Sequence, residues 1–342
     1  MTISRQVTQN YWKDGQTTAP DGRDAPGTSH RSWHHVRRAV GASAVVLLAV
    51  SCAATAGLPG GTDGRARLDQ PLAAAGAAVP LGTAPHAEAG AAAASLTGYA
   101  ERLRRAELRR VAAAKRWGLA EVPLRPPAPP DRRPELASDS GHLTGDGLPP
   151  VITRVPTTDR VVFLTVDDGY EKDPAFPRML RELDLPYSAF IADYVASDDY
   201  GYFRRMHRDG AAVHNHTLNH KELPRLSYEH QRREICGMQE VLEREIGQAT
   251  PLFRPPYGAY DRDTLRAAAA CGIRAVPLWA EEAWALRFDW GRADRRFHPG
   301  DIILTHFRGP EEWGGTMTDM LRRTLRTVTE QGFALARLED YL

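Results

Sequence analysis

The second half of the sequence predicts an α/β fold, a distorted and incomplete (β/α) barrel of about seven parallel strands. From about Val151 onward, short β-rich runs alternate with helical patterns, which is typical of parallel sheets. The region has roughly 190 residues, short of the ~250 of a full eight-stranded barrel. Reactive polar residues follow several of the runs, at the place where such folds form active sites.

The individual elements follow from local patterns. The helix expected over 227–246 begins at Ser227 and stops at Gly247, and Gly272 ends the helix after it. The expected strands are 160–166, 187–192, 211–214, 251–254, 273–279, 301–306 and 333–338.

The N-terminal region, residues 1–56, carries the pattern of an export signal. Basic residues precede an uninterrupted small and apolar run over 39–57. Three outcomes stay open: cleavage after Ala56, lipidation of Cys52 in a weak lipobox, or retention as a membrane anchor. The last is open because the run is near the ~20 residues of a spanning helix. We expect an exported protein that is secreted, membrane-anchored or, less favoured, a lipoprotein.

Residues 57–150 are expected to be a largely disordered linker rich in Ala, Pro and Arg, because they carry few large apolar groups. One helix is expected over 93–121, either as a solvated spacer or as a contact to an anionic wall polymer or membrane surface. The Pro-rich stretch 122–150 is typical of a linker. The catalytic domain is therefore expected over 151–342.

Composition narrows the classes of partner. The formal net charge is +1, which argues against a nucleic-acid binder driven by a positive field, and no nucleic-acid motif is present. The chain has three cysteines and no CxxC, so a cysteine zinc site is excluded. Cys236 and Cys271 could form a disulfide in an oxidising compartment or remain two buried thiols. We expect a monomer.

Chemistry-bearing side chains stand after expected strands that are distant in sequence. Two imidazoles and a carboxylate make a three-ligand site for a divalent metal with an open position. A metal lowers the pKa of bound water from ~15.7 towards ~7, so a nearby carboxylate suffices as a base. A further histidine could protonate a leaving group. The side chains are Asp167, Asp168, His214, His216, His220, Arg254, Asp289 and His306.

This pattern resembles the polysaccharide deacetylase family, carbohydrate esterase family 4, which is related to chitooligosaccharide deacetylases. TVDDG at 165–169 resembles the family's TFDDG, and HTLNH at 216–220 matches H(S/T)xxH. RPPYG at 254–258 matches RxPxG, and LTH at 304–306 matches LxH. The DxxDW motif is present only in its second half, 289–290, where Leu286 replaces the first Asp.

The resemblance implies a ligand set for the metal. Asp168, His216 and His220 would hold an ion, usually zinc, with cobalt or another divalent ion as alternatives. His214 matches no family position and is expected either behind the ligands or in a purely structural role.

The resemblance also implies catalytic roles. Asp167 would be the general base, oriented by Arg254, and His306 would be the general acid, oriented and charge-tuned by Asp289. Further residues would shape the site: the Tyr257 N–H at the oxyanion, and Trp290 and Leu304 around the acetyl methyl.

The implied reaction is metal-dependent hydrolysis of N-acetyl groups on hexosamine units of a polysaccharide, with release of acetate. Peptidoglycan is the favoured polymer for an exported enzyme with a long spacer, and chitin-like oligomers come next. Two alternatives stay open: an acetyl-ester hydrolase acting on a polysaccharide such as xylan, and a non-catalytic wall-binding member of the fold.

Overall fold

The computed structural model describes residues 84–342, with side chains from residue 95 onward. The predicted N-terminal region 1–56, the apolar run 39–57, Cys52 and the linker residues 57–83 lie outside the described residues. Within the described part of the chain, no helix is long and apolar enough to cross a membrane. The residues from Ala91 to Leu342 belong to one compact unit.

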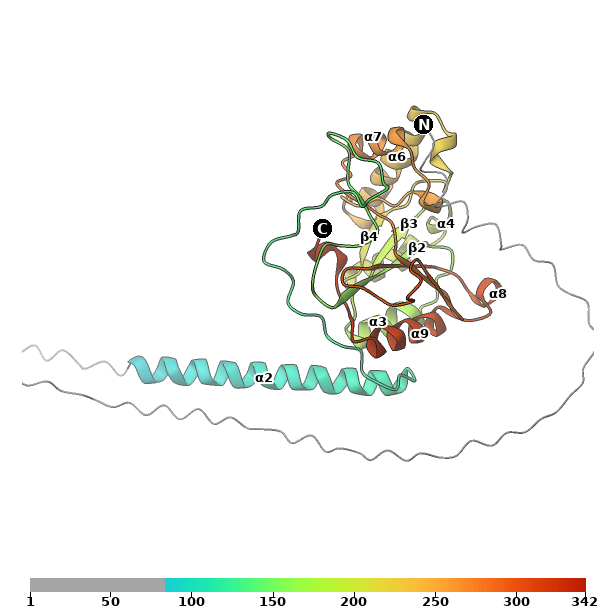
Figure 1. Cartoon of the computed structure of the whole chain (residues 1–342). Helices are drawn as coiled ribbons and strands as arrows, with labels where there is room; N and C mark the ends of the chain where they lie inside the picture. The colour runs from blue at the N-terminus through green and yellow to red at the C-terminus, as the bar shows by residue number, and fades with distance from the viewer. Residues whose placement is uncertain (1–83) are drawn as a thin grey trace, which may run out of the picture. The chain divides into compact units, whose positions relative to one another are not determined.

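Strands and helices alternate along this unit (Figure 1). The strands are β1 (Val151–Ile152), β2 (Val161–Asp168), β3 (Ser188–Ile191), β4 (Ala212–Asn215), β5 (Val276–Pro277), β6 (Glu281–Ala283), β7 (Phe288–Trp290), β8 (Ile302–His306) and β9 (Ala334–Leu335). The α-helices are α2 (Ala84–Arg116), α3 (Ala175–Leu183), α4 (Asp193–Ala196), α5 (Tyr200–Arg208), α6 (Tyr228–Ile246), α7 (Arg262–Ala270), α8 (Pro310–Trp313) and α9 (Met317–Glu330). Three short 3₁₀ helices are η1 (Leu223–Arg225), η2 (Pro256–Gly258) and η3 (Leu338–Asp340).

The main sheet has seven strands in the order β4-β3-β2-β8-β6-β7, and β9 pairs with the start of β2. All of these pairs are parallel except β6 with β7. Beyond β4, isolated bridges join Asn215 to Phe253 and Leu252 to Ala275. The chain then runs on into β6, which pairs with β8, so the strands curve into an incomplete barrel. The predicted α/β class is confirmed.

Apolar helix faces build the core against the sheet. On α3, Phe176, Met179, Leu180 and Leu183 are buried, at the spacing of one helical face. The same apolar cluster contains Leu321 and other residues of α9, and α3 and α9 lie together on one side of the strands (Figure 1). The core therefore covers the face of the sheet that packs on the helices, and the carboxyl ends of the strands lie outside it.

The observed strands differ from the predicted ones where a segment pairs with its neighbour over only a few residues. The 251–254 run forms only bridges, because the prolines at 251 and 255 offer no N–H to a ladder. The short strands β1, β6 and β7 carry no clear pattern of their own and were not predicted. The helix expected from Ser227 to Gly247 is present as α6, and Gly247 ends it with a φ of 94°.

Residues 122–150, expected as a linker, pack on the domain in the structure. The backbone N–H and hydroxyl of Thr153 both donate to Asp139, and Leu124 bridges to Ala334. Ala334 is far from Leu124 in sequence, so composition alone could not reveal this contact. The part predicted to be disordered therefore contributes an ordered strap that begins at the end of α2.

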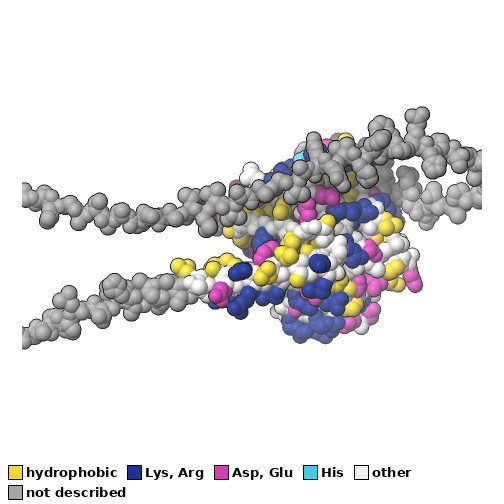
Figure 2. Space-filling view, turned by 90° about the horizontal axis from the view of Figure 1, so that it is seen from below, with side chains coloured by type: hydrophobic (Ala, Val, Ile, Leu, Met, Phe, Trp, Pro, Cys, Tyr) yellow, Lys and Arg dark blue, Asp and Glu magenta, His cyan; other side chains and the backbone are white. Residues whose placement is uncertain are grey.

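The helix expected over 93–121 is present as α2 and stops earlier, where Gly118 adopts a left-handed backbone conformation. Near its end, buried Arg110 donates to the carbonyls of Leu183 and Pro123 and ties the helix to the domain. Further back, Leu96 and Tyr99 are exposed. Basic and acidic side chains are mixed over the face displayed in Figure 2, so no single sign of charge dominates it.

Candidate active site and metal centre

Two adjacent carboxylates end strand β2. Asp167 and Asp168 are both buried, and Asp168 has a φ of 79°, a conformation that bulky residues rarely adopt. The positive φ breaks the alternation of an extended strand, so the two side chains need not point to opposite faces. Both carboxylates approach the Nε2 of His216, at 3.7 Å from Asp167 and 3.5 Å from Asp168.

The histidine-rich segment after β4 forms a tight loop. Asn215 accepts a hydrogen bond from the N–H of Thr217, and the Thr217 hydroxyl accepts one from the N–H of His220. Thr217 and His220 both have positive φ angles, 74° and 52°. Such conformations in non-glycine residues are uncommon and recur at functional sites. The loop brings the rings of His216 and His220 to a centroid distance of 4.9 Å.

Asp168, His216 and His220 form the one cluster of potential metal ligands in the described part of the chain, with ligand atoms within 4.8 Å of one another. The Nδ1 of His216 lies 2.7 Å from the Arg254 carbonyl, so that nitrogen carries the proton and Nε2 is left to bind a metal. Burial alone would raise the pKa of Asp168, but the imidazoles of His216 and His220 outweigh it and hold the pKa well below its usual range.

The cluster fits a divalent cation. The Oδ1 atom of Asp168 is buried and has no hydrogen-bond partner, and it lies 3.5 and 3.3 Å from the Nε2 atoms of His216 and His220. An unpartnered carboxylate oxygen facing two imidazole nitrogens is the donor set of a three-ligand metal site. The predicted ligands are therefore together in space.

Arg254 holds the carboxylate of Asp167, which is not part of the ligand cluster. Its Nη1 donates to Asp167 Oδ1 at 2.7 Å and to the Thr165 hydroxyl at 2.9 Å. The remaining donors bond the carbonyls of Pro277 and Leu278, and the guanidinium is fully buried. The predicted partnership of Arg254 with Asp167 is present, and the other contacts give the guanidinium no freedom to leave.

His306 ends strand β8, directly beside Asp167 in the register of the sheet. The carboxyl group next to it is Glu282 of β6, whose Oε1 lies 3.3 Å from His306 Nδ1. The Trp284 ring lies 6.2 Å from the imidazole. Burial lowers the pKa of His306, although Asp168 and Asp167 act in the opposite direction. Burial, and then the charge of Asp289, raise the pKa of Glu282 to about 8.

The predicted contact between Asp289 and His306 is absent, and this part of the site assignment is corrected. Asp289 lies on β7 and forms a two-point ion pair with Arg287. Glu282, its register partner across the β6–β7 hairpin, reaches the histidine instead. The Asp-Trp sequence at 289–290 matches half of a family motif, but in the folded chain Glu282 is the carboxyl group that lies next to His306.

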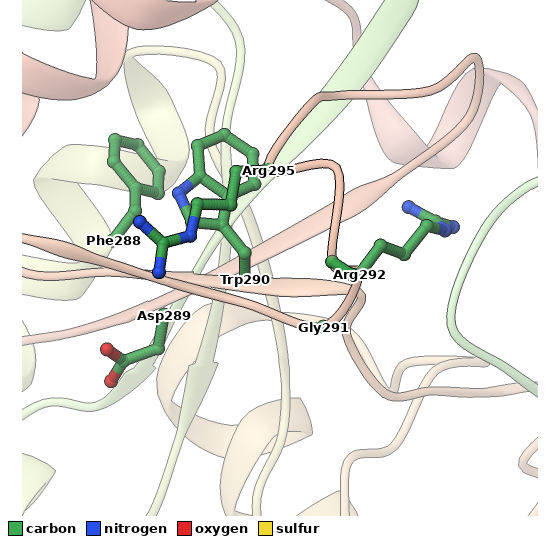
Figure 3. Close-up of a pocket in the computed structure, with 7 residues that line it drawn as sticks. Phe288, Asp289, Trp290, Gly291, Arg292 and Arg295 are labelled. Atoms are coloured by element: carbon green, nitrogen blue, oxygen red, sulfur yellow. The ribbon is translucent and has the colours of Figure 1, made fainter.

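Trp290 also lies apart from the metal cluster. Its ring stacks on Phe288 at 5.1 Å and packs against Phe297 at 5.0 Å. Figure 3 shows Phe288 and Trp290 on one side of their strand and Asp289 on the other, at a pocket of about 730 Å³ that also includes Arg292 and Arg295. Trp290 therefore walls a separate pocket, and Trp284 is the tryptophan beside His306.

Tyr257 and Leu304 have positions compatible with their predicted roles. Tyr257 has a φ of 62°, and within the described part of the chain its N–H donates to no other group. Its ring lies 4.7 Å from that of His220. Ile303 packs in the helix-side core, so strand alternation directs Leu304 and His306 to the opposite, interior face.

Two open questions from the sequence have structural answers. His214 is buried and bonded to Glu339 at 2.6 Å and to Thr250, so it ties β4 to the C-terminal turn and belongs to no metal cluster. Cys236 and Cys271 form a disulfide that links α6 to the end of α7.

The fold and the site together define a class of protein: an α/β enzyme with a metal-ligand cluster and acid–base groups at the carboxyl ends of parallel strands. Comparison with known proteins agrees. Residues 154–276 match the family model described as polysaccharide deacetylase. An uncharacterised protein of Streptomyces coelicolor is 45% identical, over 58% of this chain and 79% of that protein.

More distant relatives have named activities. A chitooligosaccharide deacetylase of Bradyrhizobium sp. is 28% identical over 53% of this chain and 85% of that protein. A peptidoglycan-N-acetylmuramic acid deacetylase of Bacillus subtilis is 21% identical over 54% and 73%. The solved structure of a peptidoglycan N-acetylglucosamine deacetylase shares the fold, with a TM-score of 0.50, 22% identity and coverage of 56% and 92%.

The chain therefore belongs to the polysaccharide deacetylase family, and its relatives with named activities are deacetylases of chitooligosaccharides and of peptidoglycan. Sequence reasoning missed two charged residues at the site, Glu282 and Arg308. Glu282 is one of two adjacent acidic residues after a predicted strand, which was an available signal. Arg308 contacts Asp168, but no signal in the sequence indicated it except its position two residues after His306.

Proposed function

We propose that this protein removes N-acetyl groups from the hexosamine units of peptidoglycan, with chitin-like oligomers as the second candidate substrate. The observation that carries the proposal is the cluster of Asp168, His216 and His220, with Asp167 and its register neighbour His306 next to it. Acyl hydrolysis needs an electrophilic centre, a base and an acid within reach of one carbonyl, and these groups supply all three.

Asp168, His216 and His220 would hold the cation, for which zinc is the first candidate and cobalt or another divalent ion the alternatives. When bound, the ion supplies Lewis-acid chemistry by polarising the acetyl carbonyl and acidifying water. Among the described residues, three protein ligands gather there, which is the number that catalytic zinc sites use.

The residues around the cluster carry the proton transfers. Asp167, oriented by its hydrogen bond from Arg254, accepts the proton of the attacking water. The Tyr257 N–H donates to the oxygen that gains charge when the carbonyl becomes tetrahedral. His306, next to Glu282, delivers a proton to the departing amine nitrogen as the carbon–nitrogen bond breaks. The products are acetate and a free amino sugar, so all atoms of water and amide are accounted for.

A pocket beside the ligand His220 favours a carboxylate-bearing glycan. The pocket measures about 470 Å³ and is lined by side chains that include Tyr194, Lys221 and Tyr257. Among the described residues, Lys221 has no ion-pair or hydrogen-bond partner. Peptidoglycan has carboxylates that would pair with this cation, on its peptide stems and on muramic acid units whose lactyl group carries no stem, whereas chitin-like oligomers are neutral. This complementarity supports peptidoglycan as the substrate.

An exported location is part of the proposal. The export pattern over 39–57 supports it, and so does the disulfide, because disulfides persist in oxidising compartments. Secreted, membrane-anchored and lipidated forms all suit an enzyme that meets the cell wall. We propose that the enzyme acts as a monomer, since all the groups named above come from a single chain.

Acetate release tests the proposed function. The full chain, loaded with zinc or cobalt, is assayed on peptidoglycan and on chitooligosaccharides side by side, with Asp168→Ala as control. We expect metal-dependent acetate from peptidoglycan. Acetate from acetyl-xylan alone would favour the ester-hydrolase alternative, and binding to cell walls without any acetate release would favour the wall-binding alternative.

A further inference from the structure

The two oxygens of the Asp168 carboxylate have different surroundings. Oδ1 faces the imidazoles of His216 and His220 and has no hydrogen-bond partner. Oδ2 accepts a hydrogen bond from Arg308 Nη2 at 2.7 Å. One oxygen is therefore directed at the metal position, while the other is occupied by a cation that the matched family motifs do not include.

Arg308 is fixed in place by its neighbours. It follows β8, and its Nε lies 3.3 Å from Glu312 at the start of the next short helix. The guanidinium lies 5.5 Å from the centre of the Tyr170 ring. The preceding residue, Phe307, accepts a hydrogen bond from the N–H of Glu171, which joins this loop to the loop after β2. Arg308 thus approaches Asp168 from a braced position.

The same strand end shows a repeated arrangement. Asp167 and Asp168 are adjacent buried carboxylates, and each has its own arginine, Arg254 for the first and Arg308 for the second. Each guanidinium bonds a single oxygen of its carboxylate, Arg254 the Oδ1 of Asp167 and Arg308 the Oδ2 of Asp168. The two side chains are therefore held separately, each by a residue from a different loop.

We propose that Arg308 is a positioning residue for the metal ligand Asp168. It holds Oδ2, so Asp168 offers the cation a single oxygen, Oδ1, in a fixed orientation. This inference rests on the metal site of the proposed function. Arg308 occupies the oxygen on the far side of the carboxylate and bonds neither imidazole among the described residues, so it leaves the metal position open.

The proposal makes a prediction about metal affinity that does not depend on catalysis. Partners behind metal ligands typically contribute about 10- to 100-fold in affinity. Zinc affinity is measured on the full chain by competition with a chromogenic chelator. We expect Arg308→Met to bind zinc about 10- to 100-fold more weakly than the unaltered protein.

Two companion variants sharpen the measurement. Arg308→Gln keeps a shorter donor without the charge and should lose less affinity, and it carries the test if Arg308→Met does not fold. Arg266→Met, which removes an exposed arginine with an acidic partner three residues earlier on α7, is the matched control and should bind zinc like the unaltered protein. Thermal melts of the metal-free forms show whether the loss reflects the site or the fold.

A spectroscopic readout separates positioning from general destabilisation. Cobalt bound with Asp168 as a one-oxygen ligand has few ligands and intense visible absorption, whereas a freed carboxylate can add its second oxygen. We expect weaker cobalt bands in Arg308→Met than in Arg266→Met at full loading. Zinc affinity in Arg308→Met equal to or tighter than that of the unaltered protein would overturn the proposal.

The test of the role of Arg308 and the test of the proposed function can give different outcomes. Zinc binding that weakens without Arg308, in a protein that releases no acetate from any glycan, would support the positioning role and refute the deacetylase proposal. A protein that binds neither zinc nor cobalt would overturn both.

Discussion

Glu282 Oε1 lies 3.3 Å from His306 Nδ1, and the two groups have pKa values shifted in opposite directions. Burial raises the pKa of Glu282 to about 8, and burial lowers the pKa of His306. Both shifts favour a protonated carboxyl beside a neutral imidazole over two separated charges. The Glu282 carboxyl can therefore hold a proton next to the proposed acid.

The first prediction separates Glu282 from Asp289. Glu282→Gln keeps the shape of the side chain and removes its ability to exchange that proton with His306. We expect kcat to fall about 10²-fold, within the range that a positioned proton donor contributes. Asp289→Asn, whose carboxylate pairs with Arg287, should lower kcat far less. Equal losses in the two variants would show that the hairpin matters only as structure.

The second prediction concerns the proposed base and acid. Asp167→Asn and His306→Ala should each lower kcat by about 10²- to 10⁴-fold, because each removes one proton transfer. Zinc content, measured by atomic absorption, should stay near that of the unaltered protein, since neither residue is among the proposed ligands. Full turnover in either variant would refute its role.

The third prediction uses neighbouring histidines as a matched pair. His216→Ala removes a ligand and should abolish stable zinc binding and chelator-reversible activity. His214→Ala, two residues earlier, breaks the contacts to Glu339 and Thr250 and should lower the melting temperature while zinc still binds. Isothermal titration with zinc and thermal denaturation distinguish the two effects. The assignment fails if His214→Ala loses the metal and His216→Ala keeps it.

The fourth prediction addresses substrate choice. Lys221→Met removes the unpartnered cation beside His220 and should raise KM for glycans that carry muramic acid carboxylates about two- to fivefold, because an exposed ion pair contributes up to about 1 kcal/mol. Lys115→Met, on α2, is the lysine control. Steady-state assays on carboxylate-bearing and neutral oligomers of equal length give the ratio of the two KM values. If this ratio is the same in Lys221→Met as in the unaltered protein, the pocket no longer supports peptidoglycan as the substrate.

The fifth prediction is a pH dependence of stability. Burial, and then the neighbouring charge of Asp301, raise the pKa of Glu281, which shares Arg292 with that aspartate. The folded protein holds a proton there that the unfolded chain releases above its ordinary pKa of 4.5. Because the unfolded state then binds fewer protons, this group lowers the free energy of unfolding as pH rises from 4.5 towards the folded pKa.

Glu281→Gln removes that titration. Urea denaturation of the metal-free protein at several pH values should show a smaller decline in stability for Glu281→Gln than for the unaltered chain. Glu330→Gln, on an exposed stretch of α9, serves as the control and should follow the unaltered chain. Parallel pH curves for Glu281→Gln and the unaltered chain would contradict the raised pKa.

Local patterns were sufficient for the central strands, and the family resemblance identified the candidate ligands of the site. The strands β2, β3, β4 and β8 are apolar runs of the expected length, and parallel pairing brings their carboxyl ends to one edge. That geometry places Asp168, His216 and His306 near one another whatever the details of the loops. The turn residues that end α6 and α7, Gly247 and Gly272, were likewise predictable, because glycine readily adopts the positive φ they show.

The sequence by itself thus determined the fold class and the candidate side chains for metal binding, and the family resemblance added the partnership of Arg254 with Asp167. Only the tertiary structure decided that Glu282 replaces Asp289 beside His306, that Arg308 holds Asp168, and that residues 122–150 pack on the domain. The physical reason is the same in each case. Strand patterns and turns are set by neighbouring residues, whereas the partner of a long charged side chain depends on which distant segment the folded chain brings within its reach.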